Sequence, residues 1–576
     1  MVLVTTAINS TIEIDDDILL LGEWCNGEDL SERHHKLVKG SLNYHWKDRD
    51  KFYKDHKTII ALYNKLLPQY SDSLNLLHNV SYSLSFWAII IGPWLLFFIS
   101  NLFDRWSSIT QAKEEGGFDY VALSVPRESE MIATNMKDYY EISGQDIWNN
   151  YIFSKIVKNY TSLKFKEFPL INEITKVNRL SLKHRIKNFL PKLFDKLSFF
   201  SLSNKIIFVD SYMPINFQWT LEKLLGQKPS FFHFYNESNK GFKHLERSNL
   251  TIKYKPQNDI ETFIISMAPL QIPQSYIEKF DSLLMKAKSK NLPQSPKVIF
   301  TSNAHFFNDQ FKFWSAIHKE KGAKLILAQH GGGIGSMQVL LTEYLEKSIA
   351  DKYITWGWSD KKFSNTVQLP ALKLLNSKKY LPKKGLLHVM DDNSRYARGV
   401  SSTPISSLHI DYLEDQYHFS NLINHQLIRD YVVRKYPNNY NWEYKEKWNQ
   451  NVKFDSNKFF LKSIYEHKLI VISSNSTTFL QVLASNIPTV VYLTSKYNEL
   501  RDTSKNDFES LKKVGILFDS GELAANHINS KWSDISGWWQ SQELQSVRIE
   551  FCKKYARTSN DSLLKWKSFF EEINIG

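Results

Sequence analysis

The sequence has 576 residues, of which 42% are hydrophobic and 23% are charged, and its formal net charge is +13. This composition excludes a largely disordered chain, and the length exceeds what a single hydrophobic core normally supports. Two cysteines, Cys25 and Cys552, exclude a disulfide framework and fit a reducing compartment. The first residues lack a basic segment followed by a long apolar one, so we expect no signal peptide and a cytoplasmic protein.

Short apolar runs alternate with longer helical stretches along the chain. Continuous apolar strands separated by helices are typical of parallel sheets covered on both faces. Two sets of such runs predict an α/β fold with two doubly wound parallel-sheet domains that face a cleft. The predicted strands cover residues 2–6, 18–21, 206–210, 297–301 and 324–329 in the first set, and 353–356, 386–390, 469–473, 489–493 and 515–518 in the second.

The boundary between the two domains is expected in the polar stretch Ser359–Lys384. The first domain, residues 1–358, would then carry helical insertions at about residues 28–113 and 138–205. The second domain would cover residues 385–531. Residues 532–576 have a helical period and are expected to pack back on the cleft.

Four ionisable residues in the N-terminal half are candidates for a general base that takes a proton from an acceptor hydroxyl. Glu23 and Asp210 each follow a predicted strand, and His45 and Asp48 lie in the aromatic and charged segment from residue 44 to 49. Acids after strands also cap helices, which is the alternative interpretation for each of them. Together they predict an acceptor-side cleft.

Two segments of the N-terminal half raise the question of a membrane. The longest apolar run, Phe86–Ile99, has 14 residues, fewer than the ~20 of a membrane span, and Gly92-Pro93 interrupts it. We therefore expect a buried helix pair there. Residues 151–205 hold twelve Lys or Arg against three Asp or Glu, which favours either peripheral contact with an anionic membrane or a solvated helix. No nucleic-acid motif is present, and nucleic acid is not an expected partner.

The segment Leu325–Ser336 runs from an apolar strand into Gln329-His330 and then into glycines. Ligands of open parallel sheets gather at the carboxyl ends of strands, where His330 would lie. Gly331 and Gly332 would let backbone N–H groups approach an anion closely. His330 would hydrogen-bond a phosphate or act as a base, and the alternative is a tight turn with a locally satisfied histidine.

Two further strand ends carry groups that suit a phosphorylated donor. Arg395 and Tyr396 follow one strand, and Arg434 follows another segment; arginine binds phosphate or carboxylate bidentately, although a surface salt bridge is the alternative. A run of six polar residues opens a helix after the next strand and predicts an anion site at its N-terminus, beyond what one helix cap needs. This run, called the serine loop below, consists of Ser473, Ser474, Asn475, Ser476, Thr477 and Thr478.

Motifs of several other enzyme classes are absent from the sequence. It contains no GxxxxGK[ST], no GxSxG and no HExxH, and no Cys/His cluster has the spacing of a zinc site. The acidic pairs nearest to a metal motif, Asp391-Asp392 and the run Asp15–Asp17, are better explained as loop or capping residues. We expect neither a metal nor a cofactor.

The serine loop followed by Ile487-Pro488, together with Gln329-His330-Gly-Gly, resembles the GT-B glycosyltransferases of bacterial capsule and O-antigen assembly. More narrowly, the sequence resembles a family of transferases found in bacterial O-antigen clusters. The blocks that carry this resemblance are Val4-Thr-Thr-Ala, Leu21-Gly-Glu-Trp-Cys, Tyr44-His-Trp-Lys-Asp-Arg, Ile91-Gly-Pro-Trp-Leu, Asp104-Arg-Trp, Trp356-Gly-Trp and Gly537-Trp-Trp.

The resemblance implies a glycosyltransferase that moves a sugar from a nucleotide-sugar donor to a lipid-linked glycan acceptor at the inner face of the cytoplasmic membrane. It places the donor on the C-terminal domain, at the serine loop and Arg395, with His330 at the cleft. A CMP-activated keto-acid sugar is one donor that fits. The alternatives are a polyol-phosphate transferase with a CDP-linked donor, which matches His330-Gly331 better, and a non-catalytic assembly scaffold at the membrane.

Overall fold

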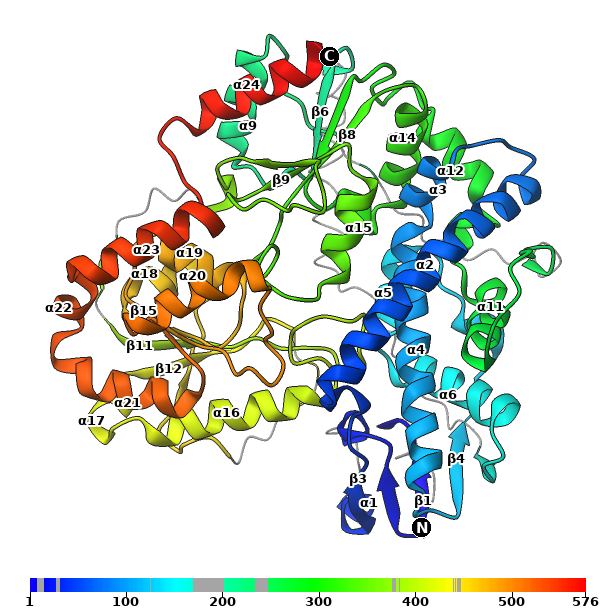
Figure 1. The fold of residues 1–576 in the computed structure, drawn as a ribbon, viewed down its shortest axis with the longest axis horizontal. Coiled ribbons are helices and arrows are strands. Elements are labelled where there is room, and N and C mark those ends of the chain that lie inside the picture. The colour runs from blue at the N-terminus through cyan, green and yellow to red at the C-terminus, as the bar shows by residue number, and fades with distance from the viewer. Residues whose placement is uncertain are drawn as a thin grey trace.

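A computed structural model describes residues 1–7, 15–26, 32–124, 126–168, 201–232, 234, 247–374, 380–382, 384–438, 440, 442 and 447–575. Within these residues the chain forms three parallel sheets, which Figure 1 shows as three units around a common centre. The expected parallel α/β class is confirmed. The segment 1–358, predicted to hold one sheet, holds one sheet and most of a second, because three strands that the sequence did not predict pair with the first two predicted strands in a sheet of their own.

The N-terminal sheet has the order β3-β2-β1-β4-β5. The chain moves one way from β1 to β3 and the other way from β4 to β5, so a topological switch point lies between β1 and β4. The strands that the sequence did not predict include the two edges, which are short and half-polar. The bounds are β1 (Val2–Val4), β2 (Ile18–Leu20), β3 (Val38–Ser41), β4 (Tyr120–Ser124) and β5 (Phe165–Phe168).

The helices of this unit range from 3 to 29 residues in length. They are η2 (Glu23–Cys25), α1 (Glu32–Leu37), η3 (His45–Lys47), α2 (Arg49–Leu77), α3 (Leu84–Ile90), α4 (Gly92–Glu115), η4 (Glu128–Met131), α5 (Met136–Ile142) and α6 (Asp146–Tyr160).

The predicted buried helix pair is confirmed as α3 and α4. Pro93 occupies the first turn of α4, where proline is tolerated. The stretch Leu84–Glu115 is long and apolar enough to cross a membrane, but 94% of its most apolar window is buried inside the protein. The predicted membrane contact falls mainly on residues 169–200, which lie outside the described residues.

The middle sheet has the order β10-β9-β8-β7-β6, so its strands follow one another in space as they do in sequence. Its strands are β6 (Ile206–Val209), β7 (Val298–Thr301), β8 (Lys324–Ala328), β9 (Lys352–Thr355) and β10 (Thr366–Gln368). The helices of this unit are α9 (Ile215–Leu224), α11 (Asp259–Gln271), η6 (Gln274–Tyr276), α12 (Phe280–Ala287), α13 (Ala304–Phe307), α14 (Asp309–Glu320), α15 (Leu341–Ile349) and η7 (Leu372–Leu374).

The C-terminal sheet has the order β13-β12-β11-β14-β15-β16, with a switch point between β11 and β14. Its strands are β11 (Lys384–Val389), β12 (Tyr431–Arg434), β13 (Lys453–Phe454), β14 (His467–Ile472), β15 (Thr489–Tyr492) and β16 (Leu517–Phe518). The helices that follow or cover it are α16 (Leu408–Leu422), α17 (His425–Ile428), α18 (Phe460–Glu466), α19 (Thr477–Ala484), α20 (Asp502–Lys513), α21 (Gly521–Lys531), η9 (Trp532–Asp534), α22 (Ile535–Gln540), α23 (Gln542–Tyr555) and α24 (Ser562–Ile575).

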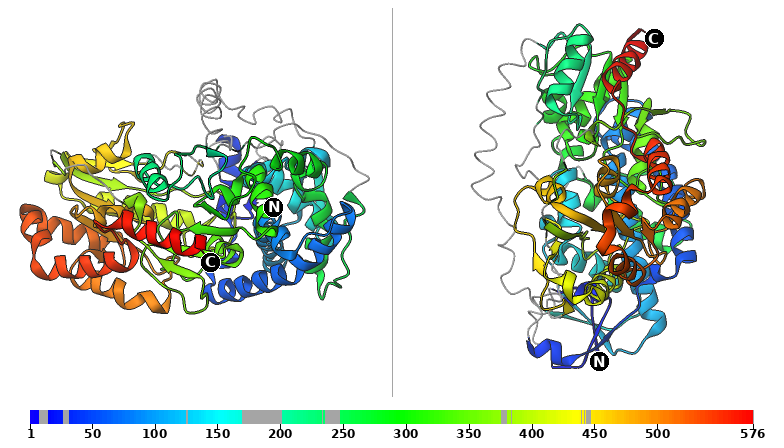
Figure 2. Two further views of the ribbon diagram at one scale, coloured as in Figure 1. Left: turned by 90° about the horizontal axis from the view of Figure 1, so that it is seen from above. Right: turned by 90° about the vertical axis from the view of Figure 1, so that its left-hand side faces the viewer.

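The C-terminal helices join two of the units. Helix α23 packs on α19 and α20 of the C-terminal unit, whereas α24 returns to α9 and the middle sheet. There Phe570 packs edge-on against Phe208 and Phe300, at ring-centroid distances of 5.1 and 5.6 Å. Figures 1 and 2 show this last helix beside the middle sheet, far along the chain from the strands it covers.

Candidate active site

A cavity of about 270 Å³ lies between the three units. The middle unit contributes His330 at the end of β8 and Asn303 after β7, and the C-terminal unit contributes Arg398. Helices α4 and α5 of the N-terminal unit add Phe97 and Tyr140. The carboxyl ends of parallel strands are where such folds bind ligands, so this space, called the His330 cavity below, is the candidate site.

His330 belongs to a buried acid–histidine cluster. Its Nδ1 lies 3.4 Å from Oε1 of Glu346, a side chain on α15 that is only 1% exposed. His305, which is fully buried, approaches the same Oε1 with Nε2 at 3.3 Å, and the Tyr353 hydroxyl donates to the other oxygen at 2.8 Å. The carboxylate lies on the Nδ1 side of the His330 ring without a hydrogen bond to it, so Nε2 is the ring nitrogen that Glu346 leaves for a ligand.

Burial and the neighbouring charges shift the pKa values of His330 and Glu346. Burial lowers the pKa of His330 below its ordinary value, Glu346 opposes this, and His305 and Lys373 lower the pKa further. Burial raises the pKa of Glu346, but His330, His305 and the Tyr353 hydrogen bond outweigh it, so the net direction is down. At neutral pH the site therefore holds a neutral imidazole beside a carboxylate, which is the state of a general base.

Arg398 brings positive charge to the same cavity. Its guanidinium lies 4.8 Å from the ring centroid of Tyr140 and 5.6 Å from that of Tyr440. Its Nε is buried and has no hydrogen-bond partner among the described residues. A half-buried guanidinium with unused donors suits a phosphate or a carboxylate.

The end of β6 adds a second group of polar side chains next to His330. Asp210 and Tyr212 adopt positive φ angles of 43° and 57°, a conformation that non-glycine residues rarely take. The Tyr212 ring meets the His330 ring edge-on at 6.4 Å, and Lys373 lies 4.6 Å over Tyr212 while it donates to the His330 carbonyl at 3.0 Å. Asp210 is exposed at this edge, so it stays a candidate base.

The glycine turn after His330 packs directly on the serine loop. The Gly332 N–H donates to Oγ1 of Thr477 at 2.9 Å. A Cβ atom at Gly332 would lie 2.1 Å from the carbonyl carbon of Ser476, so only glycine permits this approach. Gly331 is less constrained, since its Cβ would meet Thr477 Oγ1 at 3.5 Å. Gln329 fixes the turn by hydrogen bonds. Its side-chain oxygen accepts from the Trp356 N–H and the Trp358 indole, and its side-chain nitrogen donates to the Gly331 carbonyl.

Some side chains of the serine loop are used in contacts within the protein, and others are partly exposed to solvent. Ser473 is buried and shares a hydrogen bond of 2.8 Å with Tyr412, and Asn475 donates to Ser336 at 3.0 Å. The sequence assigned these two side chains to the donor, but they hold the strand end and the interdomain contact. Ser474, Ser476, Thr477 and Thr478 are half-exposed, and their contact with a donor stays a prediction.

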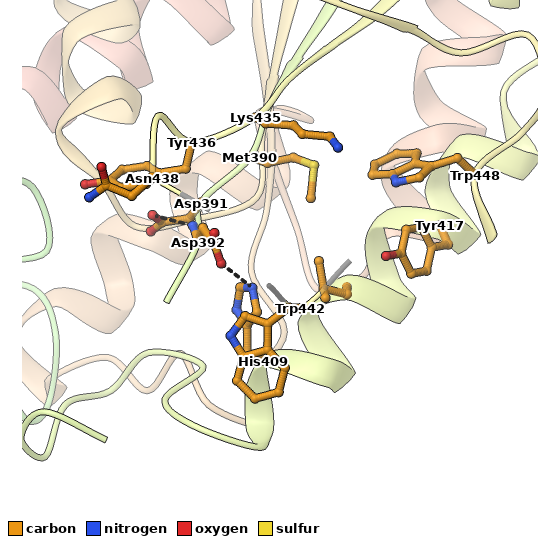
Figure 3. A pocket seen from close by; sticks show the side chains of 11 residues that line it. Met390, Asp391, Asp392, His409, Tyr417, Lys435, Tyr436, Asn438, Trp442 and Trp448 are labelled. Carbon is orange, nitrogen blue, oxygen red and sulfur yellow. Dashed lines mark hydrogen bonds and ion pairs between the residues drawn. The ribbon is translucent and has the colours of Figure 1, made fainter. Parts of the chain in front are cut away.

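A second cavity, about 220 Å³, opens at the ends of β11 and β12, beside the switch point of the C-terminal sheet. Figure 3 shows it bounded by two pairs of rings: Trp442 with His409, and Trp448 with Tyr417, at centroid distances of 5.6 and 5.0 Å. Asp392 fixes His409 through a contact of 3.2 Å at Nε2. We call it the aromatic pocket. A pocket with aromatic rings in its walls can bind a flat heterocycle by stacking.

The aromatic pocket is linked to the serine loop by one side chain. The Tyr412 hydroxyl accepts from the backbone N–H of Asp391 at 2.7 Å and bonds Ser473 at 2.8 Å. Tyr412 thus joins the ends of β11 and β14 across the switch point. The serine loop therefore contacts Tyr412 through Ser473 and the glycine turn through Thr477.

Three residues that the sequence assigned to the donor lie elsewhere. Arg395 forms a short ion pair with Asp146 of α6, and Tyr396 is buried and donates to the same carboxylate at 2.6 Å. Arg434 is paired with Asp455 at 2.5 Å. Because their donors are used within the fold, these assignments are corrected: Arg395 and Tyr396 join the C-terminal and N-terminal units, and Arg434 braces a sheet edge.

Three candidate bases of the N-terminal unit also lie apart from His330. Glu23 accepts a short hydrogen bond from Ser41, His45 is buried against Asp104, and Asp48 caps α2 by accepting from the Lys51 N–H at 3.0 Å. The structure gives them no place among the residues that line the His330 cavity. The capping interpretation therefore holds for Asp48.

Sequence reasoning missed Glu346, His305 and Arg398. Glu346 and His305 are a buried acid and a buried base on α15 and α13, and they come together only when the two helices are placed beside β8. Arg398 lies three residues after Arg395, and residue spacing alone does not distinguish the two. Among the described residues, no group of three His, Cys, Asp or Glu side chains is arranged to hold a metal ion.

A family model, described as LIC12162 family transferase, matches residues 1–570. No curated protein matches the sequence. Three solved structures are similar to it at low identity. They are the wall teichoic acid polymerase TagF soaked with CDPG (10% identity, 53% of this chain and 76% of that chain, TM-score 0.29), the glycosyltransferase SnogD from Streptomyces nogalater (12%, 58% and 86%, 0.32), and a mutant O-GlcNAc transferase from Thermobaculum terrenum (9%, 90% and 98%, 0.30).

Proposed function

Because the chain belongs to the LIC12162 family of transferases, we propose that it is a GT-B-type glycosyltransferase that acts without a metal. In this proposal it moves a sugar from a nucleotide-activated donor to a hydroxyl of a growing bacterial surface polysaccharide. The observation that carries the proposal is the His330 imidazole, whose Nδ1 lies 3.4 Å from the buried Glu346 carboxylate, in a cavity that Arg398 also lines.

The proposed reaction uses His330 as the general base. Its Nε2 takes the proton of the acceptor hydroxyl while that oxygen attacks the anomeric carbon of the donor. The resulting imidazolium is stabilised by Glu346, whose Oε1 lies 3.4 Å from Nδ1. The positive charge of Arg398 stabilises the negative charge that develops on the departing phosphate.

The donor would lie along the edge from the aromatic pocket to the His330 cavity. The rings of Trp442 and Trp448 suit a nucleobase, and the half-exposed hydroxyls of the serine loop suit the phosphates. Of the donors considered, a CMP-activated keto-acid sugar presents both a phosphate and a carboxylate to Arg398. The acceptor is proposed to be lipid-linked, which would bring this cytoplasmic enzyme to the inner membrane surface.

A nucleotide-binding experiment tests the proposal first. We expect calorimetric titration with CMP, CDP, UDP and GDP to show one nucleotide that binds, and Trp442→Ala to weaken that binding at least tenfold. A transfer assay with the matching donor follows. His330→Asn should abolish transfer, whereas His418→Asn, at an exposed histidine on α16, should leave it unchanged.

The outcomes separate the alternatives. Transfer of a polyol phosphate from a CDP-linked donor would replace the sugar donor with the second candidate on the same site. Full activity of His330→Asn in cells, with no nucleotide bound by the purified protein, would refute the enzyme and favour the assembly scaffold. Loss of transfer on addition of a chelator would refute the metal-free mechanism.

A further inference from the structure

A third cavity, larger than the other two, lies on the N-terminal unit. It has a volume of about 550 Å³ and runs between η3, the start of α2 and α4. Helix α4 lines it with residues spaced by three and four positions, among them Phe103, Trp106 and Thr110, so one face of this helix forms its floor. We call it the η3 groove. The proposed reaction does not use it.

One wall of the groove holds a histidine with an unused ring nitrogen. The His45 side chain is 1% exposed, and its Nε2 lies 3.1 Å from Oδ1 of Asp104. Asp104 also accepts from the Tyr44 hydroxyl at 2.6 Å and from Arg105 at 2.9 Å. Nδ1 of His45 has no hydrogen-bond partner in the described part of the chain.

The charge of Asp104 decides what His45 offers. Burial raises the pKa of Asp104, but Arg105 and the hydrogen bonds from His45 and Tyr44 hold it below its usual range. Because Nε2 faces Asp104, Nδ1 is the ring nitrogen left for another partner, and a hydroxyl can pair with it whether Nδ1 donates or accepts. A buried polar atom without a partner is unfavourable. A ligand hydroxyl at the groove would satisfy it.

The floor of the groove is a fixed aromatic surface. The partly exposed Trp106 ring is held edge-on by Tyr160 at 5.3 Å and packed against Phe263 at 5.5 Å. A rigid indole face with hydroxyl and amide side chains beside it, here Thr110 and Gln111, matches a sugar, which has one apolar face and a rim of hydroxyls.

The charges at the groove favour a neutral ligand. Lys51 forms a short ion pair with Asp55, and Lys47 lies 3.9 Å from Asp411 of α16. The two lysines at the rim thus already have carboxylate neighbours. Charged phosphate or carboxylate ligands would have to compete with these pairs, whereas neutral sugar units would not.

From these features we infer that the η3 groove binds a neutral saccharide segment. The groove stands apart from the His330 cavity, since Phe97 in that cavity and Trp106 are nine residues apart on α4, about 14 Å along the helix axis. The further step, that the segment belongs to the acceptor, rests on the proposed function. In that role the groove holds the chain while its end is extended elsewhere.

The test uses the full-length protein without a donor. Neutral gluco-, galacto- and rhamno-oligosaccharides of two to eight units are titrated and followed by calorimetry and tryptophan fluorescence. We expect saturable binding by at least one series, stronger for longer members. Thr110→Arg, at an exposed position that fills the groove without disturbing the core, should weaken binding at least tenfold, and Trp106→Ala should do the same.

Matched controls make the result decisive. Thr220→Arg, at an exposed threonine on α9, should bind as the wild type does. In transfer assays, Thr110→Arg should raise KM for long acceptors and leave kcat and short acceptors unchanged. Binding lost in Thr110→Arg from a protein without transferase activity would support the groove and refute only the proposed function. Absence of binding by every series, or unchanged binding in Thr110→Arg, would overturn the inference.

Discussion

Glu346→Gln tests the proposed base most directly, because it removes a charge without removing a side chain. Glutamine has nearly the same shape and can still accept from the Tyr353 hydroxyl, which lies 2.8 Å away. What it loses is the negative charge beside His330 and His305. If His330 becomes an imidazolium during the reaction, the transition state loses an ion pair that the resting enzyme does not have.

The size of the loss follows from the geometry. Unit charges at the 3.4 Å that separates His330 Nδ1 from Glu346 Oε1 interact by about 5 kcal/mol at an effective dielectric constant of about 20. Only part of this is lost, since the amide dipole and water compensate. We expect kcat to fall by about 100- to 1,000-fold, which corresponds to ~2.7–4.1 kcal/mol.

The pH profile distinguishes a catalytic loss from a structural one. Burial lowers the pKa of His330, so kcat/KM of the wild type should fall with acid only below the ordinary histidine value of ~6.5. Glu346 opposes that shift, so its charge keeps the pKa of His330 higher than burial alone would. In Glu346→Gln the acid limb should therefore move to still lower pH.

A double variant gives the refuting result. In a His330→Asn background the Glu346→Gln change should cost almost nothing further, because both residues act through one proton. Multiplicative losses in the double variant, or an acid limb that stays in place in Glu346→Gln, would refute the assignment of His330 as the base. Circular dichroism and the melting temperature of each variant check that the fold is kept.

Three further changes have expected outcomes. Arg398→Lys should raise KM for the donor by about tenfold to 100-fold in a steady-state assay, because a charge-assisted hydrogen bond contributes ~1.5–3 kcal/mol; an unchanged KM would exclude Arg398 from the donor site. Gly332→Ala should destabilise the protein by ~1–3 kcal/mol in urea unfolding, since the new methyl group meets the serine-loop backbone at 2.1 Å; Gly331→Ala, with its nearest contact at 3.5 Å, is the control expected to be nearly neutral. Arg395→Ala should cost ~1.5–3 kcal/mol, because half-buried Asp146 loses its counter-ion and keeps only the hydrogen bonds from Tyr396 and Ala7; a drop in donor affinity without loss of stability would contradict this structural role.

The sequence was most informative where a signal is local. A strand that runs into His330 and glycines predicts a strand end and a tight turn, and both are present because apolar runs and glycines act over a few residues. The same holds for the strand before the serine loop. The two edge strands β3 and β5 were missed because their half-polar sequences lack the continuous apolar run of a central strand.

The choice among charged residues could not be made from the sequence. Arg395 and Arg398 have the same chemistry and lie in one loop, but Asp146, 249 residues away, pairs with the first and not with the second. In the sequence, Glu346 likewise looks like any other acid on a helix. In the folded protein it lies within 3.4 Å of His305 and His330. Such pairings depend on tertiary placement, which residue spacing does not encode.

The ion pair between Arg395 and Asp146 has a consequence for the N-terminal unit as a whole. The strand order of that unit has a switch point between β1 and β4, where open parallel sheets commonly bind ligands. After β1, the Ala7 N–H donates at 3.1 Å to Asp146, the carboxylate that also pairs with Arg395 of the C-terminal unit. Arg395, from another unit of the same chain, is thus bound beside the end of β1. Removing residues 1–168 would take Phe97 and Tyr140 away from the His330 cavity and leave Arg395 without its counter-ion. We therefore expect a chain without the N-terminal unit to be less stable and to bind its substrate more weakly.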